Sequence, residues 1–207
     1  MEYKELRIAT NDSTYFPAED TFLVADVIES ELDEMDGRAD VLDLGCGTGI
    51  LGMVAARSTK VASVTFADIS DDAIKLCEQN IKANVNILAA DCCVVKSSLF
   101  SNIIGSYDLV IFNAPYLAEG KDDPLSNAWY GGKTGTEISR QFLDEAQDHL
   151  KDHGTIILAC SSFSDLDGLY ESITKAEFLV VRDASIHISF EDILALVIKR
   201  QPDAVEE

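Results

Sequence analysis

A short segment near the middle of the chain, 111–116, contains the residue types best suited to chemistry, in the order Ile-Phe-Asn-Ala-Pro-Tyr. The carboxamide of Asn113 offers both a donor and an acceptor. The carbonyl of Ala114 is held extended by the proline that follows it. Together these groups can accept the two N–H bonds of a planar amide or amine, on which Tyr116 can stack. By itself, such a segment is more often an ordinary turn that closes a strand.

A glycine-rich segment lies upstream and follows a buried apolar strand, in the order Asp43-Leu-Gly-Cys-Gly-Thr-Gly49. Its glycines permit a tight turn and a close approach of backbone to a ligand, with a helix N-terminus behind them. Asp68 stands at the end of the next predicted strand, where an acid can hold ribose hydroxyls. The spacing also fits a dinucleotide fingerprint, so an NAD-dependent oxidoreductase stays open at this point.

Two further acids favour S-adenosylmethionine over a dinucleotide. Asp43 precedes the glycines at a strand end, where it can order the loop or meet an ammonium group, and where it would repel a pyrophosphate. S-adenosylmethionine has a cationic amino-acid end and no phosphate. Asp91 follows the segment 85–90, which is predicted as the third strand, and there it can accept from an adenine amino group. Both acids could instead cap loops, which is common for Asp.

The position of Asn113 after a fourth strand, behind a glycine loop, favours a chemical role. In a doubly wound sheet that edge carries the ligand crevice. Methyl transfer from a sulfonium has a good leaving group, so positioning is the main catalytic task. Acceptors on the hydrogens of an amide nitrogen return electron density to it and make it a better nucleophile. The two motifs together predict methyl transfer to a planar nitrogen.

The elements that position these motifs alternate between apolar strands and helices, which predicts a doubly wound parallel α/β sheet. Two further strands near the C-terminus have no helix between them and predict an antiparallel hairpin. Ser70 is the expected N-cap of one helix and Gly154 the expected C-cap of another. The predicted strands are 41–44, 61–67, 85–90, 107–112, 155–159, 178–188 and 194–200, and the predicted helices are 49–57, 71–83 and 135–152.

Size and composition limit the classes of protein to which the chain can belong. With 207 residues and 47% hydrophobic residues, it is expected to form a single domain over 1–200, with a short N-terminal extension (about 1–30) and a frayed tail, 201–207. No apolar run is long enough to span a membrane, and the start lacks a signal-peptide order, so a cytosolic, cytoplasmic location is expected. The net charge of -21 disfavours binding of nucleic acid.

No metal site is predicted. The five cysteines contain no Cys-x-x-Cys pair and are expected to be reduced, mostly buried thiols. His149 and His153 have the spacing of two metal ligands on a helix, but no third ligand is evident.

At this point the motifs resemble those of the class I S-adenosylmethionine-dependent methyltransferases. Within that class the chain looks like the HemK2-type (Mtq2-like) release-factor glutamine methyltransferases of archaea and eukaryotes. The N-terminal segment 15–23, Tyr-Phe-Pro-Ala-Glu-Asp-Thr-Phe-Leu, is similar to the family signature that contributes to the cofactor pocket. The segment 129–135, Trp-Tyr-Gly-Gly-Lys-Thr-Gly, resembles the one that follows its catalytic turn.

The resemblance implies a Rossmann-like, seven-stranded, mostly parallel sheet and the cofactor S-adenosyl-L-methionine. It implies a glutamine substrate in the Gly-Gly-Gln motif of a class I translation release factor. It also implies a zinc-containing Trm112-like activator, for which the predicted edge strand, 85–91, is the expected docking place. The implied catalytic residues are Asn113, Pro115 and Tyr116, the implied substrate-binding residues are Asn113, Ala114 and Tyr116, and the implied cofactor-binding residues are Tyr15, Pro17, Glu19, Asp20, Thr21, Asp43, Gly45, Gly47, Gly49, Asp68, Ile69, Asp91, Cys92 and Asn113.

One residue departs from the family pattern, in which Asn-Pro-Pro-Tyr forms the turn. Ala114 replaces the first proline, and this relaxes the backbone restraints on the turn while both acceptors survive. Reduced or retained activity is therefore expected. Three alternatives stay open: N6-adenine methylation of DNA or RNA, a non-catalytic methyltransferase-like binding module, and a dehydrogenase.

Overall fold

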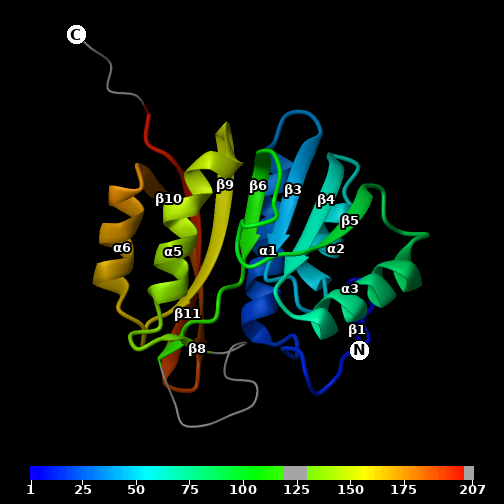
Figure 1. Cartoon of the computed structure of the whole chain (residues 1–207), viewed down its shortest axis with the longest axis horizontal. Helices are drawn as coiled ribbons and strands as arrows, with labels where there is room; N and C mark the ends of the chain where they lie inside the picture. Colours follow the sequence, from blue (N-terminus) through cyan, green and yellow to red (C-terminus); the bar gives the residue numbers. More distant parts are fainter. Residues whose placement is uncertain (119–129, 203–207) are drawn as a thin grey trace.

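A computed structural model describes residues 1–118 and 130–202 of the chain. Its centre is a seven-stranded sheet in the order β10-β11-β9-β6-β3-β4-β5 (Figure 1). Strands β9, β6, β3, β4 and β5 run parallel, and β11 and β10 add antiparallel pairs, which confirms the predicted sheet and its C-terminal hairpin. The strands are β3 (Ala39–Leu44), β4 (Val61–Asp68), β5 (Asp91–Lys96), β6 (Tyr107–Phe112), β9 (Leu150–Ser161), β10 (Phe178–Ile188) and β11 (Glu191–Arg200).

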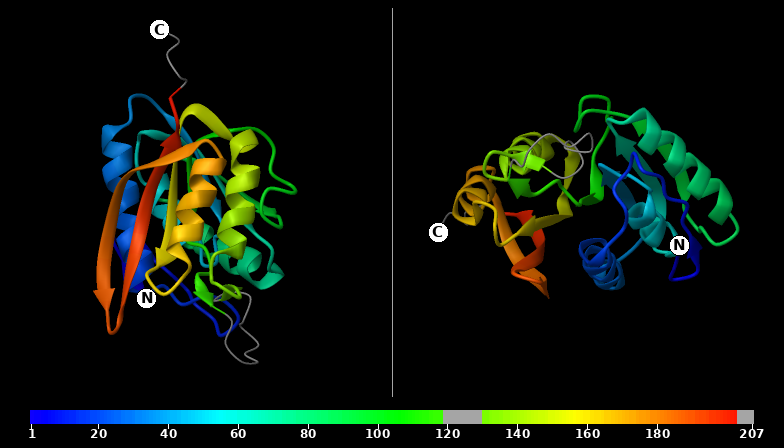
Figure 2. Two further views of the ribbon diagram at one scale, coloured as in Figure 1. Left: turned by 90° about the vertical axis from the view of Figure 1, so that its left-hand side faces the viewer. Right: turned by 90° about the horizontal axis from the view of Figure 1, so that it is seen from below.

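Helices cover both faces of the sheet (Figure 1, Figure 2). Strand β6 shows how the sequence produces this arrangement. Leu109 and Ile111 are buried in the cluster formed with α1 and α2, whereas Val110 and Phe112 are buried in the cluster formed with α5 and α6. A strand that is buried on both faces must be apolar throughout. The helices are α1 (Glu19–Glu34), α2 (Ile50–Ala56), α3 (Asp71–Asn84), α5 (Glu137–Ala146) and α6 (Leu166–Lys175), with a short 3-10 turn, Gln147–His149, after α5.

The N-terminal segment is tied to α3. Its two short strands, β1 (Glu2–Tyr3) and β2 (Leu6–Arg7), pair with each other. The Asn84 carboxamide exchanges hydrogen bonds with the backbone of Arg7, both at 2.8 Å, and Asn80 does the same with the backbone of Ala9. Both asparagines are buried. This attachment leads the following segment, 13–17, toward the carboxyl ends of the central strands.

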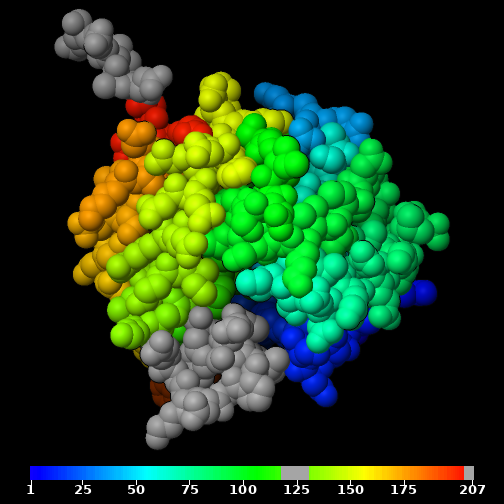
Figure 3. Space-filling view, in the orientation of Figure 1, coloured from blue at the N-terminus to red at the C-terminus, as the bar shows by residue number. Residues whose placement is uncertain are grey.

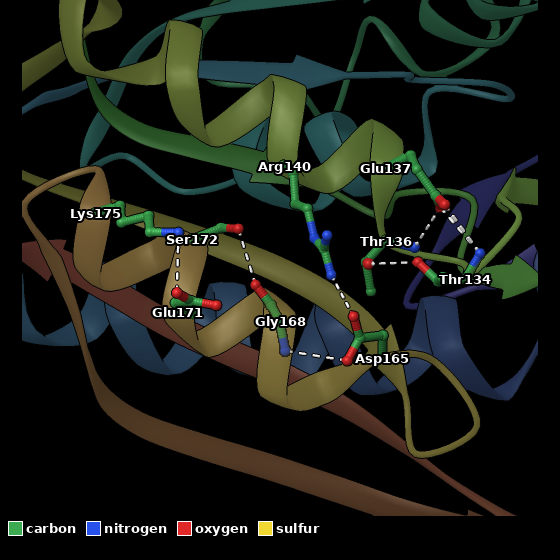
Figure 4. Close-up of polar contacts among 9 residues, drawn as sticks. All are labelled: Thr134, Thr136, Glu137, Arg140, Asp165, Gly168, Glu171, Ser172 and Lys175. Atoms are coloured by element: carbon green, nitrogen blue, oxygen red, sulfur yellow. Dashed lines mark hydrogen bonds and ion pairs between the residues drawn. The ribbon is translucent and has the colours of Figure 1, made fainter.

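Polar contacts between α5 and α6 anchor the chain that follows the Asn-Ala-Pro-Tyr turn. Glu137 accepts hydrogen bonds from the backbone N–H of Thr134, and Arg140 pairs with Asp165 at the start of α6 (Figure 4). In the space-filling view, α5 and α6 cover the left part of the face shown (Figure 3). Strand β7 (Leu117–Ala118) pairs in parallel with β8 (Tyr130–Gly132), and Trp129 lies outside the described residues.

The predicted strand over 85–90 is wrong. Helix α3 continues to Asn84, and the Ile87 N–H donates to the Asn84 carbonyl. The N–H groups of Ala89 and Ala90 both donate to the carbonyl of Ala56 at the end of α2, so they are not available for a strand ladder. Pairing with β4 begins only at Asp91.

The predicted helix over 135–152 is wrong at its C-terminal end. Helix α5 ends at Ala146, and Leu150 pairs with Tyr107 of β6 as the first residue of a long strand. Gly154 lies inside this strand and does not cap a helix. A Cβ there would stand 2.9 Å from the Tyr107 carbonyl oxygen, so glycine permits the close approach of the two strands.

Among the described residues, no helix has both the length and the apolar character needed to cross a membrane. The domain bounds stay a prediction, and residues 203–207 of the predicted tail lie outside the described residues.

Replacing Gly49 by alanine is expected to destabilise the fold more than replacing Gly37. Both glycines have a left-handed backbone, with φ of +79° and +94°, which costs an alanine roughly 1–2 kcal/mol. A Cβ at Gly49 would also lie 2.6 Å from Sγ of buried Cys77, whereas nothing lies within 4 Å of one at Gly37. Overpacking should add about 1–3 kcal/mol at Gly49 only. Urea denaturation of both variants measures the difference, and equal shifts would contradict it.

Candidate active site

A cavity of about 730 Å³ opens at the carboxyl ends of β3, β4 and β6. This size falls within the range of small-molecule and cofactor sites. Both predicted motifs contribute to its lining, since the glycine loop and the Asn-Ala-Pro-Tyr turn face the same space. Of the predicted site residues, the lining includes Tyr15, Pro17, Asp20, Thr21, Gly45, Gly47, Asp68, Ile69, Asn113, Ala114, Pro115 and Tyr116, and it lacks Glu19, Asp43, Gly49, Asp91 and Cys92.

The acid at the end of β4 faces the cavity beside the glycine loop. Asp68 Oδ2 accepts from the N–H of Gly47 at 2.9 Å, and its Oδ1 accepts from the N–H of Ser70 at the same distance. Each carboxylate oxygen has a second lone pair. Asp68 therefore holds the loop in place and still has acceptor capacity for ribose hydroxyls, with Ile69 as a neighbouring apolar surface.

Asp43, the acid that precedes the glycines, does not line the cavity. Asp43 is 1% exposed and lies beneath the loop, where its Oδ2 accepts from the N–H of Gly52 at 2.8 Å. Burial raises the pKa of this carboxyl, the Gly52 hydrogen bond lowers it and the nearby Asp68 charge raises it, and together they bring the pKa to about 7. Two roles were predicted for Asp43, ordering the loop or meeting an ammonium group. The observed contact agrees with the first, since it joins Asp43 to the first turn of α2 behind the loop.

The predicted adenine contact of Asp91, and the cofactor-binding role implied for Cys92, are wrong in their premise. Asp91 is the first residue of β5, at the opposite end of the strand from the cavity, and Cys92 follows it. The residues that follow this strand, Ser97, Ser98 and Leu99, line the cavity instead. The sequence contained a signal for them, because the polar pair after Val94-Val95-Lys96 marks the strand end. Placing the strand over 85–90 concealed it.

The Asn-Ala-Pro-Tyr turn begins directly after β6. The Asn113 Nδ2 donates to Oδ2 of Asp20 at 2.9 Å, and the Tyr116 hydroxyl donates to the same oxygen at 3.3 Å. Within residues 1–118 and 130–202, the Asn113 Oδ1 is buried and has no hydrogen-bond partner. A buried unpaired acceptor is costly in a folded protein, and at a cavity wall it indicates a site for a ligand donor.

Thr14, the residue just before the N-terminal signature, contributes a second polar group that the sequence analysis missed. The Thr14 hydroxyl is buried, lines the cavity and has no partner within the described residues. The Tyr15 hydroxyl donates to Oδ1 of Asp20 at 2.7 Å, and burial together with the Asp20 charge raises the pKa of Tyr15. Glu19 is exposed at the first turn of α1. The position of Thr14 just before the signature was the available signal.

A glycine loop, an acid with free acceptor capacity and an unpaired amide oxygen line one cavity, which agrees with the class of S-adenosylmethionine-dependent methyltransferases. The family model described as the methyltransferase small domain matches residues 21–188. The chain therefore belongs to this family. It is an S-adenosylmethionine-dependent methyltransferase, which confirms the predicted enzyme class and cofactor and excludes the dehydrogenase.

Three individual proteins show which members of the class this chain is similar to. The "Putative protein N5-glutamine methyltransferase" of Methanocaldococcus jannaschii is 32% identical over 204 residues, which cover 95% of this chain and 96% of the relative. The human "Methyltransferase HEMK2" is 30% identical over 150 residues, 70% of each chain. A solved chain of the E. cuniculi Mtq2–Trm112 complex has a TM-score of 0.62 and 22% identity, covering 92% of this chain and 99% of that one. These findings confirm the resemblance to the HemK2-type and Mtq2-type enzymes.

Replacing Asp43 by asparagine is expected to change the pH dependence of stability. Because burial raises its pKa to about 7, above the value of about 3.9 in unfolded chains, the folded state keeps a proton that the unfolded state releases. That contribution is complete below about pH 4 and is lost as pH rises through 7. The stability of the parent relative to Asp43→Asn should fall by up to about 4 kcal/mol across this window.

Urea denaturation of the two proteins between pH 5 and 8 measures this difference. Groups common to both cancel, so the difference isolates Asp43. A difference that stays constant over this range would show that Asp43 is ionised in the folded state throughout.

Proposed function

We propose that the chain transfers a methyl group from S-adenosylmethionine to the side-chain nitrogen of a protein glutamine, in the Gly-Gly-Gln motif of a class I translation release factor. The observation that carries this proposal is the buried, unpaired Oδ1 of Asn113, which stands at the cavity wall while its Nδ2 is bound by Asp20. An acceptor in that place suits a substrate that brings N–H donors.

The proposed catalytic residues Asn113, Pro115 and Tyr116 act by positioning. The Asn113 Oδ1 and the Ala114 carbonyl accept the two N–H bonds of the substrate amide, with the carbonyl oriented by Pro115. Both acceptors increase electron density on the nitrogen and orient its lone pair. Tyr116 offers a flat surface to the amide plane. The nitrogen becomes acidic as its new bond forms, so the proton that it loses can pass to solvent water and no strong base is required.

The proposed cofactor site uses the residues around the glycine loop. When bound, S-adenosylmethionine supplies a methyl group from its sulfonium. The neutral thioether that remains is a good leaving group. Gly45 and Gly47 allow its close approach to the backbone, Asp68 accepts from the ribose, and Ile69 with Leu99 offers apolar contact to the base. The N-terminal segment with Tyr15 and Pro17 covers the same cavity.

The relatives support this choice of substrate. The M. jannaschii relative carries the name of a protein N5-glutamine methyltransferase over nearly the full length of both chains. The E. cuniculi complex is described as responsible for methylation of the eRF1 translation termination factor. The strongly negative charge of this chain fits a protein substrate better than a nucleic acid.

Mass spectrometry of a purified class I release factor after reaction tests the substrate. We expect one added methyl group on the glutamine of Gly-Gly-Gln, and no addition when that glutamine is replaced by alanine. Parallel reactions with DNA and RNA oligonucleotides test the alternative of N6-adenine methylation. Methylation of an oligonucleotide with none on the release factor would replace our proposal.

Asn113→Ala is expected to lower kcat by roughly 10²- to 10³-fold, because it removes an acceptor that acts on the reacting nitrogen. The cavity keeps its glycine loop and Asp68, so cofactor affinity should change little. Initial rates with the release factor and calorimetry with S-adenosylmethionine separate the two effects. A variant that transfers methyl groups at the parental rate would refute the role of Asn113.

We also propose that a small zinc-containing protein of the Trm112 type binds along the edge strand β5. The correction of this strand moves the docking place from 85–91 to Asp91–Lys96. Strand β5 ends the sheet, and an edge strand can accept a further strand from a partner. A hollow lined by Ile81, Cys92 and Val94 adjoins it, and the loop that leads into it exposes 62% of Val85 and 40% of Ile87. The E. cuniculi relative is found in such a complex.

The double variant Val85→Glu/Ile87→Glu should weaken binding of a Trm112-type protein by at least tenfold, because it places two charges on the docking surface. Val181→Glu is the matched control, since Val181 is 47% exposed on β10 at the opposite edge of the sheet. Calorimetric titration of each variant with the partner measures the affinity. Equal affinities for both variants would exclude docking at β5.

A further inference from the structure

One buried carboxylate receives side-chain hydrogen bonds from the Asn-Ala-Pro-Tyr turn and from the N-terminal signature segment. Asp20, the second residue of α1, is 3% exposed. Its Oδ2 accepts from Asn113 Nδ2 at 2.9 Å and from the Tyr116 hydroxyl at 3.3 Å, and its Oδ1 accepts from the hydroxyls of Tyr15 at 2.7 Å and Thr21 at 3.3 Å. In the described part of the chain, no cationic side chain forms an ion pair with Asp20.

We propose that Asp20 is a positioning residue that sets which end of the Asn113 carboxamide faces the substrate. An ionised carboxylate only accepts hydrogen bonds, whereas a carboxamide donates from nitrogen and accepts at oxygen. Turning the Asn113 side chain over would bring two oxygens together in a buried place, with no donor between them. Asp20 therefore directs the acceptor Oδ1 of Asn113 into the cavity.

The same carboxylate holds both ends of the Asn-Ala-Pro-Tyr turn, since Asn113 and Tyr116 donate to one oxygen atom. The Ser164 hydroxyl adds a bond to the Tyr116 carbonyl at 2.7 Å. These contacts restrain a turn in which Ala114 lacks the ring of a proline. The sequence departure at residue 114 is thus offset from outside the turn.

This role differs from the cofactor contact that the sequence suggested for Asp20. All four donors come from the protein, and each carboxylate oxygen accepts two of them. Little acceptor capacity is left for a ligand. Asp20 is thus expected to influence the reaction through Asn113 and Tyr116, with little effect on cofactor affinity.

Asp20→Asn keeps the shape of the side chain and adds a donor. Asn113 can then bind residue 20 through its own oxygen and turn its NH₂ group into the cavity. That group would oppose the N–H donors of a substrate amide and would favour a carboxylate. In a Ser-His-Asp triad, exchange of the carboxylate for its amide leaves the geometry intact but holds the histidine partner in the wrong tautomer, so the hydrogen-bonding pattern of the partner changes there too.

The test combines four measurements, of which the rate and the inhibition measurements rest on the proposed glutamine substrate. Asp20→Asn should lower kcat by roughly 10²- to 10³-fold, with an S-adenosylmethionine affinity within about threefold of the parent. A release factor carrying Gly-Gly-Glu should inhibit Asp20→Asn more strongly than it inhibits the parent. Asp26→Asn, an exposed change on the same helix, should behave as the parent in all three respects.

The fourth measurement needs no substrate and separates this inference from the proposed function. In the unmutated protein, the Nδ2 proton of Asn113 that Asp20 binds should exchange slowly with solvent by NMR, because the accepting carboxylate is buried. Fast exchange would overturn the inference even if Asp20→Asn failed to fold. An Asp20→Asn variant with parental kcat and inhibitor preference would overturn it, as would one that only loses cofactor affinity. If the parent methylates no glutamine, the proposed function fails while slow exchange still supports the amide orientation.

Discussion

The site depends on the parallel pairing of β3 with β6. Leu44 and Phe112 are partners in this ladder and are the last residues of their strands. The chain therefore leaves the sheet at the same level in both strands, into Gly45 on one side and Asn113 on the other. Parallel strands must end at a common edge, so two loops separated by more than sixty residues form one cavity.

Three buried or partly buried acids at this edge differ in what donates to them. Asp43 accepts from the backbone of α2, and Asp68 accepts from the backbone of Gly47 in the glycine loop and of Ser70. Asp20 accepts from side chains of the Asn-Ala-Pro-Tyr turn and of its own segment. The first orders the loop, the second orders it and faces the cavity, and the third orients an amide. Identical side chains thus divide the work according to burial and to the donors that surround them.

Local sequence patterns predicted most strands of the sheet, including the two that precede the glycine loop and the Asn-Ala-Pro-Tyr turn. The apolar run 107–112 coincides with β6, because a strand buried on both faces is apolar along nearly its whole length. The run 178–188 coincides with β10, the exposed edge strand of the C-terminal hairpin. The segment 85–90 is also largely apolar, yet the N–H groups of Ala89 and Ala90 donate to the carbonyl of Ala56 at the end of α2. Apolar character alone cannot distinguish the two outcomes, because the competing acceptor lies far away in the sequence.

The sequence by itself determined the chemistry of the chain: the order of strands and helices, the glycine loop with its acids, and the Asn-Ala-Pro-Tyr turn that suits a planar nitrogen. Tertiary structure alone decided where Asp20, Thr14 and the Ser97–Leu99 segment lie, and which end of the Asn113 amide is free. The reason is physical. Motif residues are specified by spacing along the chain, whereas an amide's orientation is set by a carboxylate ninety-three residues away that only folding brings within hydrogen-bond distance.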